Sequence, residues 1–272
     1  MDTASDVQRH YTRGGLLDSV LEAIREAGHD PDHLDPEVLA PAEEFHTLGR
    51  PASIELAEAA GVSAADRVLD VGSGLGGPAR LLARRYGCHV TGIDLTPELC
   101  EVALDLTRRL GLSDLVDIRQ GDALALPFDD ARFDVVWTQH ASMNIEDKAT
   151  LFAGMRRVLR PGGRLAFFDL LAGPEQPIHY PVPWAENDRT SFLASPADTQ
   201  ALLADAGFSV QVWDDVTKAA NAFYRRMAAM PPVPSPLGLH LLIPDLAAKG
   251  ANLARNVEEG RLVLIRCVAD AT

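Results

Sequence analysis

The chain has 272 residues, a hydrophobic content of 47% and a formal net charge of −14. This length suits one large domain or a core domain with a cap, and it is enough to bury a substantial core. An acidic surface repels phosphate backbones, so we expect no nucleic-acid partner. No apolar run reaches the length of a membrane span, and the start MDTASDVQRH lacks the apolar stretch of a signal peptide. We therefore expect a cytoplasmic protein with no membrane partner.

The first sixty residues are predicted to be helical and rich in loops. A polar start precedes residues 16–28, where apolar side chains recur at helical spacing. Prolines break residues 29–37 into a loop, and residues 43–62 read as a loop and a helix with Ser53 as a possible N-cap. We expect residues 1–60 to form an N-terminal helical lid segment.

A regular alternation of strands and helices follows. We predict strands at 66–72, 89–95, 116–123, 133–140 and 164–171, with helices at 77–87, 97–111 and 146–160. Strands that alternate with helices imply a mostly parallel, doubly wound α/β sheet.

The alternation loosens after residue 172. A segment rich in proline and aromatic residues, 172–196, is predicted to be a loop. It is followed by a helix, a strand, two helical stretches and a last strand, at 197–208, 209–216, 218–230, 239–260 and 261–269. We expect the core domain to span 61–272, with cap insertions at 172–196 and 218–260.

Cysteine usage indicates neither a metal site nor a disulfide framework. Cys88, Cys100 and Cys267 are far apart and show no metal-ligand spacing. Such cysteines are typical of core or surface thiols in a reducing compartment.

The segment VLDVGSGLGG at 68–77, followed by GIDLT at 92–96, is the most informative motif. It predicts a buried strand, a glycine turn, a helix start and a second strand that ends in an acid. Gly72, Gly74 and Gly77 match the spacing G-x-G-x-x-G, which lets the backbone approach a ligand at a helix N-terminus. Asp94 lies 24 residues after Asp70 of the first strand, a sequence separation at which an acid can bind ribose hydroxyls. The motif predicts a site for a nucleoside cofactor.

Asp70 helps to decide which nucleoside binds. It precedes the first glycine by two residues, so its carboxylate would repel a pyrophosphate but suit the ammonium of a methionine group. S-adenosylmethionine (SAM) carries that ammonium and a sulfonium, and it has no phosphate. The alternatives are that Asp70 only caps loop amides, or that the chain is an NAD-dependent oxidoreductase, which we regard as distant.

The motifs VLDVGSGLGG, GIDL, GDALALPF, FDVVW and LRPGGRL occur in this order. Together they resemble class I SAM-dependent methyltransferases of the small-molecule type, over about 60–216 and the last strand. The chain is similar to glycine/sarcosine/dimethylglycine N-methyltransferases, tocopherol methyltransferases and sugar O-methyltransferases of natural-product pathways. The resemblance implies SAM as cofactor and a seven-stranded sheet of order 3-2-1-4-5-7-6 with the last strand antiparallel. A ligand crevice then lies at the carboxyl ends of the strands.

The same resemblance implies roles for residues at those strand ends. Gly72, Ser73 and Gly74 would cradle the methionine part of SAM. Asp94 would bind the ribose diol, unless it only caps the following helix, and Leu95 would pack on the adenine face.

Further cofactor contacts are implied outside the glycine loop. Asp122 would accept the adenine amine beside the backbone amide of Ala123, unless it only forms a turn. Tyr11 and the EFHTLG loop resemble a lid over SAM. His46 and Gly49 of that loop are candidates for its carboxylate, or else pack in the core.

Gln139 and His140 end the fourth predicted strand, beside the expected sulfonium. Relatives often carry an acid where His140 stands, and a histidine where Asn144 stands. His140 could accept a proton from the acceptor, orient it, or only form hydrogen bonds in a polar crevice. Four further side chains could line a substrate pocket or belong to the core: His179, Tyr180, Trp184 and Phe223.

We expect transfer of a methyl group from SAM to N or O of a small-molecule acceptor, by direct displacement and without a metal. Proximity and orientation would supply most of the rate enhancement. The alternatives are a C-methyltransferase, a SAM-fold catalyst that does not transfer methyl, and a noncatalytic SAM-binding partner protein. The acceptor and the oligomeric state cannot be read from the sequence.

Overall fold

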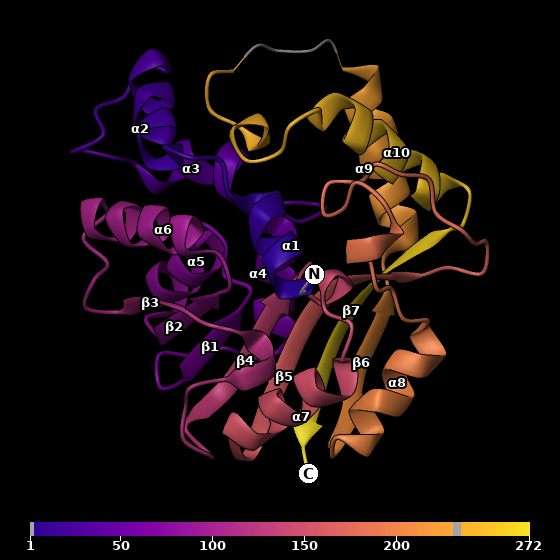
Figure 1. Ribbon diagram of the computed structural model, residues 1–272. Helices are drawn as coiled ribbons and strands as arrows, with labels where there is room; N and C mark the ends of the chain where they lie inside the picture. The colour runs from indigo at the N-terminus through magenta and orange to yellow at the C-terminus, as the bar shows by residue number, and fades with distance from the viewer. Residues whose placement is uncertain (1–2, 231–234) are drawn as a thin grey trace.

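The computed structural model describes residues 3–230 and 235–272, which are built around a seven-stranded sheet (Figure 1). The strands are β1 (Arg67–Val71), β2 (His89–Asp94), β3 (Val116–Gln120), β4 (Phe133–Gln139), β5 (Leu159–Ala172), β6 (Phe208–Asp215) and β7 (Leu262–Ala271). Their order is β3-β2-β1-β4-β5-β7-β6. β7 pairs antiparallel with β5 and β6, and the other neighbours are parallel. The predicted strand order and the antiparallel last strand are confirmed.

Helices precede, connect and follow these strands. Within the described residues the α-helices are α1 (Thr3–Tyr11), α2 (Leu16–Glu26), α3 (Pro36–Glu43), α4 (Arg50–Ala59), α5 (Gly77–Tyr86), α6 (Pro97–Arg109), α7 (Lys148–Val158), α8 (Pro196–Asp205), α9 (Thr217–Ala229) and α10 (Leu246–Glu258). Short 3-10 turns occur at η1 (Ala123–Ala125), η2 (Ser142–Asn144), η3 (Asp188–Thr190) and η4 (Leu239–Leu241). Among the described helices, none is both long enough and apolar enough to cross a membrane.

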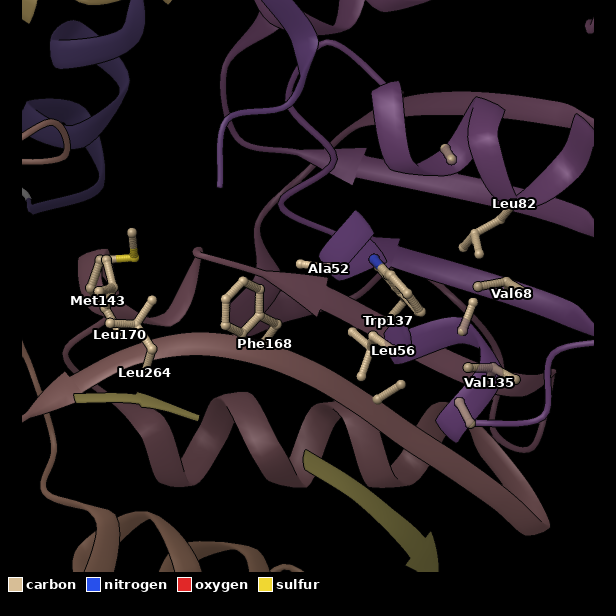
Figure 2. Close-up of a cluster of buried hydrophobic side chains, with 14 of the residues drawn as sticks. Ala52, Leu56, Val68, Leu82, Val135, Trp137, Met143, Phe168, Leu170 and Leu264 are labelled. Atoms are coloured by element: carbon tan, nitrogen blue, oxygen red, sulfur yellow. The ribbon is translucent and has the colours of Figure 1, made fainter. Parts of the chain in front are cut away.

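The central strands β4 and β5 are buried on both faces, because their alternate side chains point to opposite sides and helices cover both sides. On β5, Phe168 and Leu170 join a cluster with α4, α5 and α10, whereas Phe167 and Leu171 join a second cluster with α7 and α8. Figure 2 shows part of the first cluster, where Leu56 of α4 packs near Trp137 of β4. These apolar layers hold the strand ends at fixed positions.

The N-terminal segment contains two helices that the sequence patterns did not predict, α1 and α3. Asp35 begins α3 because its side chain accepts a hydrogen bond from the Glu37 amide at 2.9 Å, and Pro36 takes the first helical position, where its missing N–H costs nothing. The predicted loop at 29–37 is therefore wrong at its end. In α1 the only buried residue is Val7, so apolar periodicity gives almost no signal for this helix.

The prediction for α4 was correct in type but wrong at its start. The helix begins at Arg50 with Gly49 as N-cap, so Ser53 is not the cap. Ser53 lies inside the first turn and is fully buried. Pro51 in that first turn explains the earlier start, since proline is favoured at the beginning of a helix.

Helix α1 is fixed at the edge of the sheet where the parallel strands end. In Figure 1, α1 lies at this edge, and the C-terminus after β7 lies at the opposite edge. The Glu98 carboxylate accepts hydrogen bonds from the backbone amides of Arg13, Gly14 and Leu16, which ties the chain between α1 and α2 to α6.

Candidate functional site

A cavity of about 450 Å³ lies at the carboxyl ends of the parallel strands, between these ends and α1. Twelve of the residues that we predicted for catalysis or cofactor binding line this one cavity. They are Tyr11, His46, Asp70, Gly72, Ser73, Gly74, Asp94, Leu95, Asp122, Ala123, Gln139 and His140. Parallel strands bring their ends together at one edge, so residues far apart in sequence meet here.

The glycine loop passes very close to the end of β4. Gly72 and Gly74 have φ angles of +77° and +53°, in the left-handed region that favours glycine. The amides of Gly72 and Ser73 both donate to the carbonyl oxygen of Ile93, at 2.8 and 3.1 Å. A Cβ atom on Gly72 would lie 2.6 Å from Cβ of Ala141. No larger residue fits at Gly72 without moving the loop.

Two predicted acids are held by backbone amides. Asp94 accepts hydrogen bonds from the amides of Gly74 and Thr96, both at 2.9 Å. It therefore fixes the glycine loop against the start of α6. Asp122 accepts from the Leu124 amide at 2.9 Å and caps η1. Asp94 therefore binds the amide at the start of the following helix and Asp122 forms a turn, as the alternative readings of the sequence had it. Neither role uses every lone pair of the carboxylate, so both acids can still accept hydrogen bonds from a ligand.

Asp70 differs from these two acids because its carboxylate is enclosed. The residue is only 2% exposed, and its Oδ2 has no hydrogen-bond partner among the described residues. Burial, with a smaller effect of nearby Asp94, raises the pKa of Asp70 to about 8. An unpaired buried carboxylate is costly, so this position suits a cationic ligand group.

Gln139 has a defined amide orientation. The Trp137 indole N–H, which can only donate, lies 3.1 Å from Oε1 of Gln139, and the Ser53 hydroxyl donates to the same atom at 3.1 Å. The Nε2 atom has no hydrogen-bond partner among the described residues. Two donors thus hold the oxygen and leave the amide hydrogens for a ligand.

The two histidines of the cavity lie near each other, with ring centroids 6.2 Å apart. Burial lowers the pKa of His46 to about 4. Burial and the neighbouring His46 hold the pKa of His140 well below its usual value. Both rings are therefore neutral near pH 7. His140 has a φ of +48°, and its amide donates to the Phe168 carbonyl at 2.9 Å.

Tyr11 closes the cavity from the side of α1. Its hydroxyl donates to Oδ1 of Asn144 at 2.9 Å. The Asn144 amide nitrogen donates in turn to the carbonyl oxygens of Trp184 and Thr190, at 3.0 and 2.8 Å. Asn144 thus joins α1, η2 and the loop after β5.

The cavity lining is acidic. Among the described residues it contains six carboxylates and neither lysine nor arginine; the acids are Glu43, Asp70, Asp94, Asp122, Glu146 and Asp147. Glu43 is neutralised by buried Arg80 and by Arg50. In the part of the chain that the structure describes, no group of three His, Cys, Asp or Glu side chains is placed to hold a metal ion.

Several residues for which we considered either a site role or a packing role do not line this cavity: Gly49, His179, Tyr180, Trp184 and Phe223. Gly49 caps α4 and accepts a hydrogen bond from His46 at 3.1 Å. Trp184 is buried and donates to Ser191 at 3.0 Å. His179 pairs with Glu259 at 2.8 Å. The alternative, a core or surface role, holds for these side chains.

Ser53, Glu43 and the apolar side of α1 contribute to the site without having been predicted from the sequence. Thr3, Ala4 and Val7 of α1 line the cavity. Ser53 was considered only as a helix cap, although a serine beside buried residues in a helix already suggests a side-chain partner.

Comparison with known families and proteins agrees with this geometry. Residues 69–167 match a family model described as a methyltransferase domain. The chain is 42% identical over 142 residues to methyltransferase GfsG of Streptomyces halstedii, which covers 52% of this chain and 48% of that protein. It is 40% identical over 173 residues to 27-O-demethylrifamycin SV methyltransferase of Amycolatopsis mediterranei, which covers 59% of this chain and 63% of that protein.

The fold is shared with a solved structure. Geranyl diphosphate C-methyltransferase from Streptomyces coelicolor superposes with a TM-score of 0.73 at 19% identity, covering 100% of this chain and 99% of that one. The chain spans about half the length of the curated relatives it matches. These relatives include proteins named as N-, O- and C-methyltransferases.

Proposed function

Since the chain carries a class I S-adenosylmethionine-dependent methyltransferase domain, we propose that the protein transfers a methyl group from SAM to an oxygen or nitrogen atom of an uncharged small molecule. The observation that supports this most is the meeting of twelve predicted residues in one cavity. SAM, when bound, supplies an electrophilic methyl group on its sulfonium.

The residues of the cavity suit the parts of SAM. Asp70, with its unpartnered oxygen, would pair with the ammonium. The glycine loop would admit the methionine chain, Asp94 would bind the ribose diol, and Asp122 with Ala123 would bind the adenine edge. Leu95 would pack on the adenine ring. Gln139 would offer its amide hydrogens, and a neutral His140 would orient the acceptor at the methyl group.

We propose that the N-terminal segment 1–60 acts as a lid and that the segments 172–196 and 218–260 form a cap; residues 1–2 and 231–234 of these segments lie outside the described residues. The hydrogen bonds from Tyr11 to Asn144, and from Asn144 to the loop after β5, join the two. A lid that excludes water would leave the acceptor atom unsolvated and aligned.

The charge of the lining supports an uncharged acceptor. The cavity has no lysine or arginine among the described residues, and its two histidines are neutral near pH 7. A carboxylate or phosphate on the acceptor would lose its hydration there without gaining a cationic side chain of the protein, which is unfavourable. The side toward α1 is lined by Val7, Phe45 and Leu242, which suit an apolar body.

The test uses three acceptors with one apolar body and different head groups: para-octylbenzyl alcohol, para-octylaniline and para-octylbenzoate. We expect calorimetry to show SAM binding, and S-adenosylhomocysteine to form with the alcohol or the aniline at least tenfold faster than with the benzoate. Mass spectrometry and NMR of the product identify the methylated atom. Binding of NAD without binding of SAM would contradict the proposed function.

A faster reaction with the benzoate would contradict the uncharged acceptor. Such an acceptor would instead fit a second, polar cavity of about 480 Å³, whose lining includes Arg9, Arg13 and Arg189.

SAM affinity is expected to rise with pH up to about 8. The proposed ion pair needs Asp70 as a carboxylate, whereas burial keeps it largely protonated below its pKa of about 8. Each pH unit below that value should weaken binding by up to about tenfold, or 1.4 kcal/mol. Calorimetry between pH 6 and 8 checks this, and Asp70→Asn should bind SAM weakly and without this slope. A flat profile in the unaltered protein would contradict the role of Asp70.

The same pKa shift has the opposite effect on the protein without ligand. A carboxyl group whose pKa is raised on folding binds its proton more tightly in the folded state. Its stabilising contribution is complete below the ordinary carboxyl pKa and is lost as the pH rises through about 8. The ligand and the ligand-free fold therefore favour different protonation states of Asp70.

A further inference from the structure

We infer that His46 is the residue that accepts a proton from a hydroxyl acceptor, and that the accepting atom is its Nδ1. This inference rests on the proposed function, and it assigns to His46 a role that we had considered for His140. It replaces the contact with the SAM carboxylate that we had considered for His46, because an Nδ1 atom without a proton cannot donate to a carboxylate. Three features support it: the tautomer of the ring, the position of its free nitrogen and the charge that stabilises the protonated ring.

Three oxygen atoms surround Nε2 of His46. The Gly49 carbonyl oxygen lies 3.1 Å away, Oγ of Ser53 3.0 Å away, and a carboxylate oxygen of Glu44 3.4 Å away. The Gly49 carbonyl, which is within hydrogen-bond distance, can only accept a hydrogen bond. Nε2 therefore carries the ring proton.

The Ser53 hydroxyl leads to the same tautomer independently. Its single hydrogen is donated to Oε1 of Gln139, whose identity as oxygen follows from the second donor, the Trp137 indole. The Ser53 oxygen then faces His46 with a lone pair and accepts from Nε2. A neutral imidazole has one N–H, so Nδ1 of His46 bears a lone pair.

Nδ1 is the atom of His46 that remains for a bound molecule. The side chain is 3% exposed to solvent yet lines the cavity. Nδ1 forms no hydrogen bond with any residue that the structure describes, whereas Nε2 is occupied on the side of α4. His46 lies in the loop between α3 and α4, which forms part of the cavity wall, and its Nδ1 lone pair is the one available to a bound molecule.

Glu44 makes His46 better suited to take a positive charge than His140. The Glu44 carboxylate lies 3.4 Å from Nε2 and is held by a hydrogen bond from Nε of Arg50 at 2.9 Å. An imidazolium at His46 would form beside this anion. No described carboxylate forms an ion pair or hydrogen bond with His140, and its Nε2 is enclosed without a partner.

Atoms and electrons balance in the transfer step. A lone pair of the acceptor oxygen forms the new bond to the methyl carbon, and the electron pair of the carbon–sulfur bond goes to sulfur. The O–H electron pair stays on oxygen while its proton moves to Nδ1 of His46. His46 is a weak base in the free protein, but a methylated, still protonated oxygen is a far stronger acid than an imidazolium. The proton therefore moves readily as the new bond forms.

The first test measures the tautomer without any reaction. Nitrogen-15 NMR of the ligand-free protein near pH 7 should show His46 with a protonated Nε2 and a bare Nδ1. The opposite tautomer would overturn the inference. This result does not depend on SAM or on an acceptor.

The second test removes the proton-accepting nitrogen of His46 while keeping the hydrogen bonds on its other side. In His46→Gln the amide nitrogen can still donate near Gly49 and Ser53, but no atom replaces Nδ1. With para-octylbenzyl alcohol we expect kcat to fall by about 10²–10⁴, while SAM affinity stays within about threefold. With para-octylaniline, a neutral amine that reacts through its own lone pair, kcat should fall less than tenfold.

The matched control is His140→Gln, which should mainly raise KM for the acceptor. Unchanged kcat for the alcohol in a folded His46→Gln protein that binds SAM would overturn the inference. If His46→Gln does not fold, the nitrogen-15 NMR of the unaltered protein decides: a protonated Nε2 with a bare Nδ1 supports the inference, and the opposite tautomer overturns it. Failure of the unaltered protein to bind SAM would instead contradict the proposed function.

Discussion

Glu43→Ala is expected to lower the free energy of unfolding by about 3–5 kcal/mol, because it leaves a buried guanidinium without its partner. The side chains of Glu43 and Arg80 are 4% and 3% exposed, and the two groups form an ion pair. Arg80 also donates to the Ala103 carbonyl and the Thr107 hydroxyl, so it cannot turn to solvent without losing these bonds. Urea denaturation followed by circular dichroism measures the change.

The control for this prediction is an exposed ion pair of the same chemistry. Arg225 and Glu258 lie 2.8 Å apart, but their side chains are 68% and 57% exposed. Glu258→Ala should therefore change the free energy of unfolding by less than about 1 kcal/mol. Replacing both buried partners, as Glu43→Leu with Arg80→Met, should be less damaging than Glu43→Ala alone. Equal effects at the buried and the exposed pair would contradict this expectation.

Gly72→Ala is expected to lower turnover by about a hundredfold and to weaken SAM binding. The φ of +77° strains any residue with a side chain, and the new methyl group would lie 2.6 Å from Cβ of Ala141. Relief of that contact moves the glycine loop or the end of β4, and a shift of about 1 Å in a positioning element can cost about 10² in rate. Calorimetry and the release of S-adenosylhomocysteine measure the two effects.

Two variants separate the contact from the backbone strain. Gly111 has a φ of +67°, and a Cβ atom added there would meet no described atom within 4 Å, so Gly111→Ala reports strain alone, away from the site. The double variant Gly72→Ala with Ala141→Gly removes the contact and should recover part of the SAM affinity. Normal SAM binding by Gly72→Ala would show that the loop tolerates the shift.

Much of the core follows from local sequence patterns. Strands β1 and β4 are short, largely apolar segments that are buried on both faces, so their sequences alone predict buried strands. The glycines at 72 and 74 need a left-handed backbone, which few other residues adopt. The order of the strands came from the resemblance of the ordered motifs, since pairing between distant strands leaves no local trace.

The elements missed in the N-terminal segment are those whose stability depends on distant partners. Helix α1 buries one side chain of its own and is fixed by bonds from Gln8 to Leu95 and from Tyr11 to Asn144. Such contacts join residues more than eighty positions apart. No window of the sequence contains both partners.

The sequence by itself determined which residue types gather at the strand ends, because each follows a strand whose apolar pattern is local. Only the tertiary structure decided what those residues can do. The ring proton of His46 is placed by Gly49 and Ser53, and the amide of Gln139 by Trp137 and Ser53. Protonation states and amide orientations depend on atoms within about 3 Å, and those atoms come from separate elements that packing brings together.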